Sequence, residues 1–295
     1  MTDDDLGPDG GTLMAMDFDP EHGGGGWHVG VRNVLLIAVR EYRIATRGRW
    51  SIGLAVLFAL FSVGIVAFGT SRVGPAQYDA VLASLAELGV YLIPLVALAV
   101  GYDTVVGAEE SGALDMLFSL PVSRGQVVLG KYLGRAGVLA TGMLVGLGVG
   151  GLAVVGVIGG TGIAKYAAFV LIATATGSAF HGVGVLVSTV AREKARALAL
   201  ALAAWVWFVL LHDLAAIALI ATVDLPDSVL AGMVLTNPAD VFRVLVLSQL
   251  HTAPGGFAAV LAKAALSMPV LVVALALWII IPVSLATGTI GRRRV

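Results

Sequence analysis

Four ionisable side chains lie within or beside long apolar runs, where burying a charge is costly. They are Asp103, His181, His212 and Asp213. Ionisable residues in membrane-spanning segments are functional candidates by default, and a neighbouring histidine and aspartate can relay a proton, bind a metal ion or anchor two helices. A single His–Asp pair without a second cluster of ligands makes a poor metal site. We therefore favour a buried polar anchor and expect neither a metal ion nor a cofactor.

The stretch from Gly125 to Tyr132 almost spells a phosphate-binding loop. That motif requires Ser or Thr after its lysine, to hold magnesium, and a buried strand before its first glycine. Here Tyr132 follows Lys131, and the residues in front of Gly125 are Pro121-Val122-Ser123-Arg124. We therefore exclude nucleotide binding and expect that this chain is not itself an ATPase.

The segment from Gly107 to Arg135 is a polar island between two apolar runs. Its charged residues are Glu109, Glu110, Asp115, Arg124, Lys131 and Arg135. Pro121 breaks the segment, because proline disrupts a helix interior. A charged loop between two such runs lies outside the hydrocarbon, where a water-soluble protein can bind it. We predict that this loop docks a cytosolic motor, and that the motor moves the flanking helices.

The composition indicates a polytopic membrane protein. Of 295 residues, 58% are hydrophobic and 13% are charged, and the mean hydropathy is +0.96, whereas soluble domains carry about 25% charged residues. The chain has no cysteine, which excludes disulfides, thiolate metal sites and cysteine nucleophiles. We expect an all-α protein of the cell membrane that contacts lipids and no nucleic acid.

The N-terminal segment, residues 1–31, differs from the rest in composition. It contains seven acidic residues, no lysine or arginine, and a run of glycine from Gly23 to Gly26. Such a composition cannot bury enough apolar surface to order itself, and it lacks the basic and apolar regions of a signal peptide. We expect a disordered, acidic, glycine-rich cytoplasmic tail, followed by a transmembrane domain over residues 32–295.

The segment Val34–Trp50 has the pattern of an amphipathic helix. Arg40, Arg43 and Arg47 share one face at helical spacing, and apolar residues beginning with Val34 occupy the other. Basic amphipathic helices of this kind lie at lipid headgroups. The alternative is a basic flank that only orients the next span, and we favour the interfacial helix.

Six apolar segments are long enough to cross a bilayer, which requires roughly 20 residues in a helix. They are Ile52–Gly69, Leu85–Val106, Leu133–Ile158, Ala167–Val190, Ala197–Val223 and Leu266–Ala286. Pro94 interrupts the second segment, and a helical turn from the polar loop precedes the third.

The distribution of lysine and arginine predicts the orientation. If the N-terminus is inside, the outer segments hold Arg72, Lys165, Arg243 and Lys263, and the inner segments hold the other 14 of the 18 basic residues. This excess follows the positive-inside rule. Both termini and the Gly107–Arg135 loop are then cytoplasmic.

Glycines recur at four-residue spacing in and before the third span. They are Gly142, Gly146 and Gly150 within it, and Gly130 and Gly134 in front of it. Small residues at this spacing let helix backbones approach closely in lipid. We expect this helix to pack tightly against a neighbour.

The longest outer segment runs from Asp224 to Phe257 and is not simply polar. Thr236-Asn237-Pro238 is typical of a helix start, with proline in the first turn, and Ala239–Leu250 has the length of a short interfacial helix. This segment covers the helix bundle or presents a surface to an outside partner. Its candidate contact residues are Asn237, Asp240 and Arg243.

The polar loop also carries a family resemblance. It reads Glu-Glu-Ser-Gly-Ala-Leu-Asp-Met-Leu-Phe-Ser-Leu-Pro-Val-Ser-Arg over residues 109–124, and Gly-Lys-Tyr-Leu-Gly over residues 130–134. With six spans and a basic amphipathic lead-in, this order resembles the permeases of ABC-2 type transporters. Further segments resemble, within that family, the permeases that serve copper-site maturation of nitrous-oxide reductase: Gly101–Asp103, Ala191–Arg196 and Asn237–Arg243. The resemblance covers about residues 32–295.

The resemblance implies a pair of permease chains, cytosolic ABC ATPase subunits and an extracytoplasmic accessory protein for copper maturation. It also implies that the loop between spans two and three forms a coupling helix against the ATPase. The docking residues carried over are Glu109, Glu110, Gly112, Leu114, Leu117, Pro121, Ser123 and Arg124. Arg192 and Glu193, between spans four and five, lie near the same partner in this interpretation.

Two other functions stay open at this point. The same architecture can export a lipid, a drug or another apolar compound. An ion-coupled carrier using His181, His212 and Asp213 is a further alternative. Against the carrier, the spans show no inverted repeat of broken helices, which many secondary transporters contain.

Overall fold

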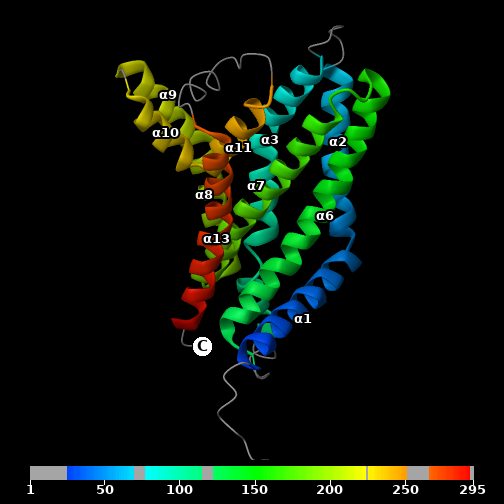
Figure 1. Ribbon diagram of the computed structural model, residues 1–295. Helices are drawn as coiled ribbons and strands as arrows, with labels where there is room; N and C mark the ends of the chain where they lie inside the picture. Colours follow the sequence, from blue (N-terminus) through cyan, green and yellow to red (C-terminus); the bar gives the residue numbers. More distant parts are fainter. Residues whose placement is uncertain (1–24, 70–76, 115–121, 224, 251–265, 293–295) are drawn as a thin grey trace, which may run out of the picture.

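The computed structural model describes residues 25–69, 77–114, 122–223, 225–250 and 266–292, and these are helical apart from short connections (Figure 1). Within these ranges, six helices are long and apolar enough to cross a membrane. The predicted all-α fold with six candidate spans is therefore confirmed. We call the end of the bundle that holds α1 and the C-terminus the α1 end, and the opposite end the α11 end.

The six candidate spans follow the order expected from the sequence, with somewhat different limits. They are α2 (Arg49–Gly69), α3 (Gln77–Gly101), α6 (Arg124–Ile158), α7 (Ile163–Val190), the run α8 (Lys194–Val206) to α9 (His212–Thr222), and α13 (Met268–Arg292). Helix α6 begins well before the predicted Leu133. Its start is fixed by a capping box, because Ser123 Oγ accepts from Gln126 N at 3.3 Å while Gln126 Oε1 accepts from Ser123 N at 3.1 Å.

Helix α1 (Gly25–Arg47) starts before the predicted Val34 and ends at a break at Gly48. The expected boundary of the acidic tail, after residue 31, therefore falls inside this helix, and residues 1–24 lie outside the described residues. The buried side of α1 carries Val34, Ile37 and Ala38. Its exposed side mixes arginine with leucine and isoleucine, so the predicted amphipathic character is present.

The predicted glycine contacts of α6 are confirmed. A methyl group added to Gly134 would lie 2.6 Å from the Ala38 carbonyl oxygen of α1, and one added to Gly146 would lie 2.5 Å from the Ala55 carbonyl oxygen of α2. The same seam includes Gly130 against Ile37, Gly142 against Leu54, and Gly150 against Ser62. Glycine at these positions lets α6 touch the backbones of α1 and α2 directly.

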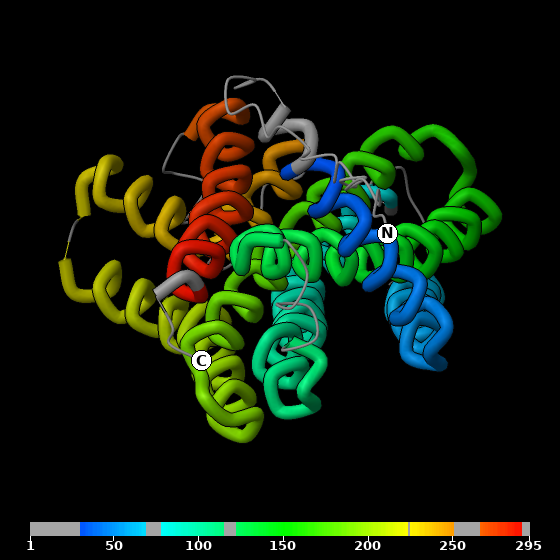
Figure 2. Tube along the Cα trace, turned by 90° about the horizontal axis from the view of Figure 1, so that it is seen from below, coloured from blue at the N-terminus to red at the C-terminus, as the bar shows by residue number. Residues whose placement is uncertain are grey.

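The helices form a layered bundle with two flanks. Figure 2 shows α1 and α2 on one flank and α8 to α10 on the opposite flank, with the other long helices between them. Helix α6 packs on α1, α2, α7 and α13, while α7 also packs on α3. Fully buried aromatic side chains fill the bundle, namely Phe58, Phe169, Phe180 and Phe242.

The fifth span contains an irregular turn. A π-helical turn, η1 (Trp207–Leu211), joins α8 to α9, and His212 N donates to the Trp207 carbonyl five residues back. π-Helical turns are rare in proteins, and those that occur are often found at functional sites. The turn lies directly before His212 and Asp213, the pair selected from the sequence.

Two short helices follow α9 at the α11 end. They are α10 (Asp227–Leu235) and α11 (Pro238–Leu247), bent by 111° relative to each other. The predicted helix start is confirmed, because Asn237 caps α11 by accepting from Ala239 N at 3.0 Å and Pro238 occupies the first turn. Taken together, the bent pair passes the same length and composition test as the six long helices.

The glycine seam gives a matched test. Gly146→Ala should lower the midpoint temperature of thermal unfolding in detergent, because overpacking a tight contact costs about 1–3 kcal/mol. Gly148→Ala is the control, since a methyl group there meets nothing within 4 Å. Equal midpoints for the two variants would refute the close approach of α6 and α2.

Candidate functional site

The polar loop after α3 begins with a short helix that a distant residue caps. Helix α3 ends at Gly101, and α4 (Val106–Glu110) follows after a brief unwound stretch. Ser188 of α7 accepts from both Val105 N and Val106 N at 3.0 Å. A buried serine hydroxyl therefore satisfies N–H groups that open the helix. No local sequence signal predicts this cap, because the two partners are more than 80 residues apart.

The far end of α4 is joined to the start of α8. Glu110 Oε1 accepts from Lys194 N at 2.8 Å, which places a carboxylate at the helix N-terminus. The Lys194 Nζ in turn lies 3.0 Å from Asp103 Oδ1. Asp103, predicted near the inner end of span two, thus lies in the unwound stretch after α3. The two loops that were expected near one partner therefore form one connected unit.

We call the exposed part of this unit the α4 surface. It consists of Glu110, Ser111, Gly112, Ala113, Ser123, Arg192 and Glu193, with Glu109 and Arg124 half-buried beside it. Gly112 has φ +70, a conformation that favours glycine. Leu114 is 1% exposed and belongs to an apolar cluster with residues of α1, α6, α7 and α13, so its side chain packs inside the bundle. Leu117 and Pro121 lie outside the described residues.

A second polar unit lies at the α11 end, around Arg243 of α11. The guanidinium bonds Asp240 Oδ1 at 2.7 Å and Asp213 Oδ2 at 2.9 Å, and its Nε lies 3.5 Å from Glu87 Oε2 of α3. Asn237 and Asp240 are 0% exposed, and Arg243 is 3% exposed. These three residues were expected to contact an outside partner. Their side chains instead point into the chain, where they tie α3, α9 and α11 together.

His212 completes this unit. Asn237 Nδ2 has two N–H groups, which reach the Phe208 carbonyl at 2.8 Å and Asp240 Oδ2 at 3.1 Å. His212 Nδ1 lies 3.1 Å from the same Asp240 oxygen and 3.1 Å from Asn237 Nδ2, so it contacts both residues. The π-helical turn ends at Leu211 and brings this histidine towards α11.

The arrangement fits an anchor better than a metal site. Ligand atoms of His212, Asp213 and Asp240 lie within 4.8 Å of one another, close enough to share an ion. However, Arg243 bonds to both carboxylates and already supplies the positive charge between them. The bond between Arg243 and Asp213 therefore joins α11 to α9.

His181, the remaining intramembrane candidate, lies on α7 and belongs to neither unit. It is fully buried, and its ring stacks on Tyr132 of α6 with ring centres 5.2 Å apart. Neither ring nitrogen has a hydrogen-bond partner among the described residues. It shares no bond with His212 or Asp213, so the structure does not assemble the three into a relay.

A buried ion network that the sequence reasoning missed joins α1 to α6. Glu41 of α1 accepts from Lys131 Nζ at 3.4 Å and from Arg135 Nε at 3.0 Å. Burial alone would raise the pKa of Glu41, but the two cations outweigh it and lower the pKa below its usual value. A signal was available, because Glu41 interrupts the apolar side of α1 and the two cations lie four residues apart on α6.

These features define a class of protein. The bundle spans a membrane several times, and its polar units tie helices together without forming a catalytic centre. Residues 35–293 match the family described as ABC-2 family transporter protein, and the chain belongs to this family. It is a permease subunit, which is not itself an ATPase and works with an ATPase subunit.

Two curated relatives are similar over almost their whole length. Both are named "Probable ABC transporter permease protein NosY". The one from Pseudomonas aeruginosa is 36% identical over 270 residues, covering 88% of this chain and 98% of the relative. The one from Stutzerimonas stutzeri is 33% identical over 268 residues, covering 87% of this chain and 97% of the relative.

The Arg243 unit can be tested by a double-mutant cycle. Arg243→Leu leaves Asp213 and Asp240 buried without their cation, and breaking a buried pair in this way costs about 3–5 kcal/mol. The midpoint of thermal unfolding in detergent should fall strongly, whereas Arg47→Leu on the exposed side of α1 should change it little.

Adding Asp213→Leu to Arg243→Leu should recover part of that loss, because it removes one of the unpaired carboxylates. Strictly additive effects of the two substitutions would show that Arg243 and Asp213 do not stabilise each other.

Proposed function

We propose that this permease couples ATP hydrolysis by a cytosolic ATPase pair to copper-site maturation of nitrous-oxide reductase outside the membrane. It either moves a sulfur or copper species or passes a conformational signal to an outer accessory protein. The names of the two relatives support a role in copper-site maturation, and the exposed α4 surface supports docking of an ATPase. In this proposal a second copy of the chain completes the permease.

One observation carries the coupling mechanism: α3 contacts one polar unit near its middle and the other just after its last residue. At the α1 end, Asp103 pairs with Lys194, next to the Glu110 cap of α8. At the α11 end, Glu87 lies 3.5 Å from Arg243. The helical residues between them span roughly 20 Å at 1.5 Å per residue. A displacement of the α4 surface is therefore communicated to α11 through α3, which contains Pro94 and ends two residues before Asp103.

The ATPase acts on the α4 surface in this mechanism. ATP binding favours one arrangement of the ATPase pair, and the permease shifts because its contacts differ between the two arrangements. Glu109, Ser123 and Arg124 lie beside or within the exposed surface and are suited to a charged partner. Glu110 has another role, since its carboxylate keeps the two loops together and makes the surface one unit.

The orientation follows from the excess of basic residues at the α1 end. The α4 surface, both termini and the acidic tail are then cytoplasmic, and α10 and α11 lie on the outer side. The exposed side of α1 combines Arg40, Arg43 and Arg47 with Leu36 and Ile44, as expected for a helix at lipid headgroups. The outer partner contacts the exposed residues of α10, because α11 is buried along nearly its whole length.

A second candidate function rests on an apolar groove along α13. The groove has a volume of about 520 Å³ and is lined by Leu235, Val270, Leu277 and Trp278, among others. Such a groove suits an exported lipid or other apolar compound. A neighbouring gene for an outer copper-maturation protein would favour the first function over this one. The ion-coupled carrier is disfavoured, because Arg243 already neutralises carboxylates that a carried ion would need.

Docking of the ATPase gives the direct test. The double substitution Glu109→Ala with Arg124→Ala removes charge from both sides of the α4 surface. The affinity for the ATPase subunit, followed by co-purification, should fall about 5- to 30-fold, as for loss of interface contacts worth about 1–2 kcal/mol. The amount of permease in the membrane should stay the same.

Asp227→Ala is the matched control, because Asp227 is an exposed acidic residue on α10. It should leave co-purification unchanged. Unaltered ATPase binding by the double variant would refute docking at the α4 surface.

A further inference from the structure

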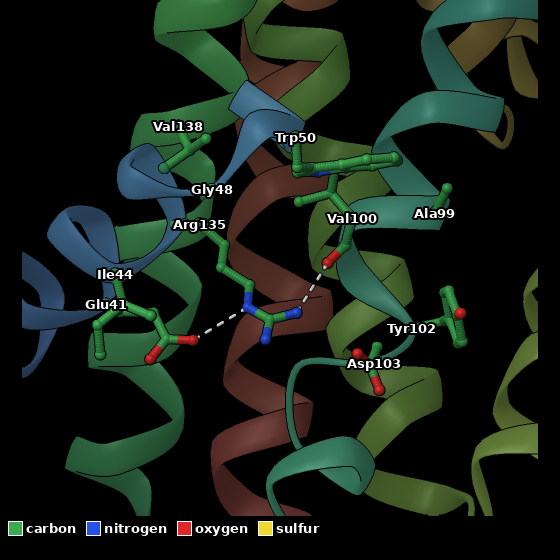
Figure 3. A pocket seen from close by; sticks show the side chains of 11 residues that line it. Glu41, Ile44, Gly48, Trp50, Ala99, Val100, Tyr102, Asp103, Arg135 and Val138 are labelled. Atoms are coloured by element: carbon green, nitrogen blue, oxygen red, sulfur yellow. Dashed lines mark hydrogen bonds and ion pairs between the residues drawn. The ribbon is translucent and has the colours of Figure 1, made fainter. Parts of the chain in front are cut away.

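A cavity lies where α1, α3 and α6 meet, beside the break between α1 and α2. It has a volume of about 390 Å³ and is lined by Glu41, Gly48, Trp50, Ala99, Asp103 and Arg135, among others (Figure 3). Asp103 also belongs to the unit around α4, through its pair with Lys194. Glu41 and Arg135 belong neither to that unit nor to the Arg243 unit, so they need a separate explanation.

Arg135 is held rigidly at this cavity. Its Nε donates to Glu41 Oε1 at 3.0 Å and its Nη1 donates to the Val100 carbonyl at 3.3 Å, as the dashed lines in Figure 3 show. These bonds engage two of the five N–H groups of a guanidinium. The other three have no hydrogen-bond partner in the part of the chain that the structure describes. A fixed guanidinium with unused donors is suited to a carboxylate or phosphate.

The charges around the cavity are not balanced. Glu41 is the single carboxylate shared by Lys131 and Arg135, which leaves one positive charge in excess. Asp103 does not cancel it, because its partner is Lys194 at 3.0 Å. Lys131 is only 5% exposed, while the Arg135 side chain is 24% exposed. The excess charge is therefore accessible at Arg135, and an anion there would neutralise it.

The surroundings indicate what kind of anion fits. Ile44, Ala45, Ala99 and Val138 give the cavity apolar walls, and Trp50 stands beside them. Trp50 lies in the first turn of α2, a candidate span, and tryptophan is enriched at the headgroup level of membranes. An anion that carries an apolar tail matches these walls better than a free ion does.

We infer that this cavity binds the headgroup of an anionic phospholipid, with the phosphodiester on Arg135 and the acyl chains along the exposed apolar residues at the start of α2. The bound lipid bridges α1, α3 and α6. A free phosphate shares the headgroup chemistry but lacks the tail, so the two sources are separable by experiment. Binding at this site requires neither ATP nor an ATPase.

The test uses the full chain, washed free of native lipid in mild detergent and titrated with dioleoylphosphatidylglycerol. Retained lipid is counted by native mass spectrometry, and the unfolding temperature is followed in parallel. The wild-type chain should bind one lipid per chain at this site, and Arg135→Gln should weaken that binding about tenfold, as for loss of a charge-assisted pair. Arg47→Gln, which removes an exposed arginine next to Gly48, should weaken it no more than about twofold.

A cavity-filling variant and two control ligands complete the test. Ala99→Trp fills the cavity without removing an ion pair, so it should abolish the bound lipid even if Arg135→Gln does not fold. Inorganic phosphate and dioleoylphosphatidylcholine should not raise the unfolding temperature at concentrations where phosphatidylglycerol does.

Equal lipid binding by Ala99→Trp and the wild-type chain would overturn the inference, as would equal effects of Arg135→Gln and Arg47→Gln. Protection by inorganic phosphate alone would identify a free-anion site instead. Equal protection by phosphatidylcholine would refute the requirement for an anionic lipid.

Discussion

A charged group cannot lie unpaired in hydrocarbon, and this constraint explains how the bundle is held together. In the described part of the chain, Glu41, Asp79, Lys131 and Arg243 are buried and each has an ionic partner on another helix. Neutralising these charges therefore also fixes helix against helix. Glu41 joins α1 to α6 through Lys131 and Arg135. Arg243 joins α11 to α9 and α3. Apolar packing in lipid supplies little directional force between helices, so these pairs and the glycine seam of α6 determine which helices move together.

The two polar units lie at opposite ends of the bundle, and α3 passes between them. This layout favours a mechanical role, because a helix that contacts both units transmits displacement between them without needing a continuous polar path. The close contacts of α6 with α1 and α2 make that side of the bundle a second rigid body. In contrast, α8, η1 and α9 are largely exposed on the other flank. His212 and Asp213 lie on α9. Their contacts with Asp240 and Arg243 link this more exposed flank to α11.

Local patterns in the sequence predicted much of the fold. The six spans follow from apolar length, the start of α11 from Asn237 and Pro238, and the α6 contacts from glycine spacing, since each signal is contained in a short segment. Contacts between residues that are distant in the sequence could not be predicted in this way. Ser188 caps a helix more than 80 residues away, and Arg243 turns inward because Asp213 and Asp240 meet it there. Charged residues in an outer segment were interpreted as surface contacts, although an arginine three residues after an aspartate also suits a buried pair.

The central claim is that a change at the α4 surface reaches α11 through the bundle. The chain has no cysteine, so spin labels can be attached at single introduced cysteines. The direct measurement is the distance between two labels, one at Phe68→Cys at the far end of α2 and one at Asp227→Cys on α10. It is made by double electron–electron resonance on the permease bound to its ATPase. The account predicts that this distance distribution shifts when ATP binds and does not shift in a complex whose ATPase cannot bind ATP. An unchanged distribution upon ATP binding, with the ATPase still attached, would contradict it.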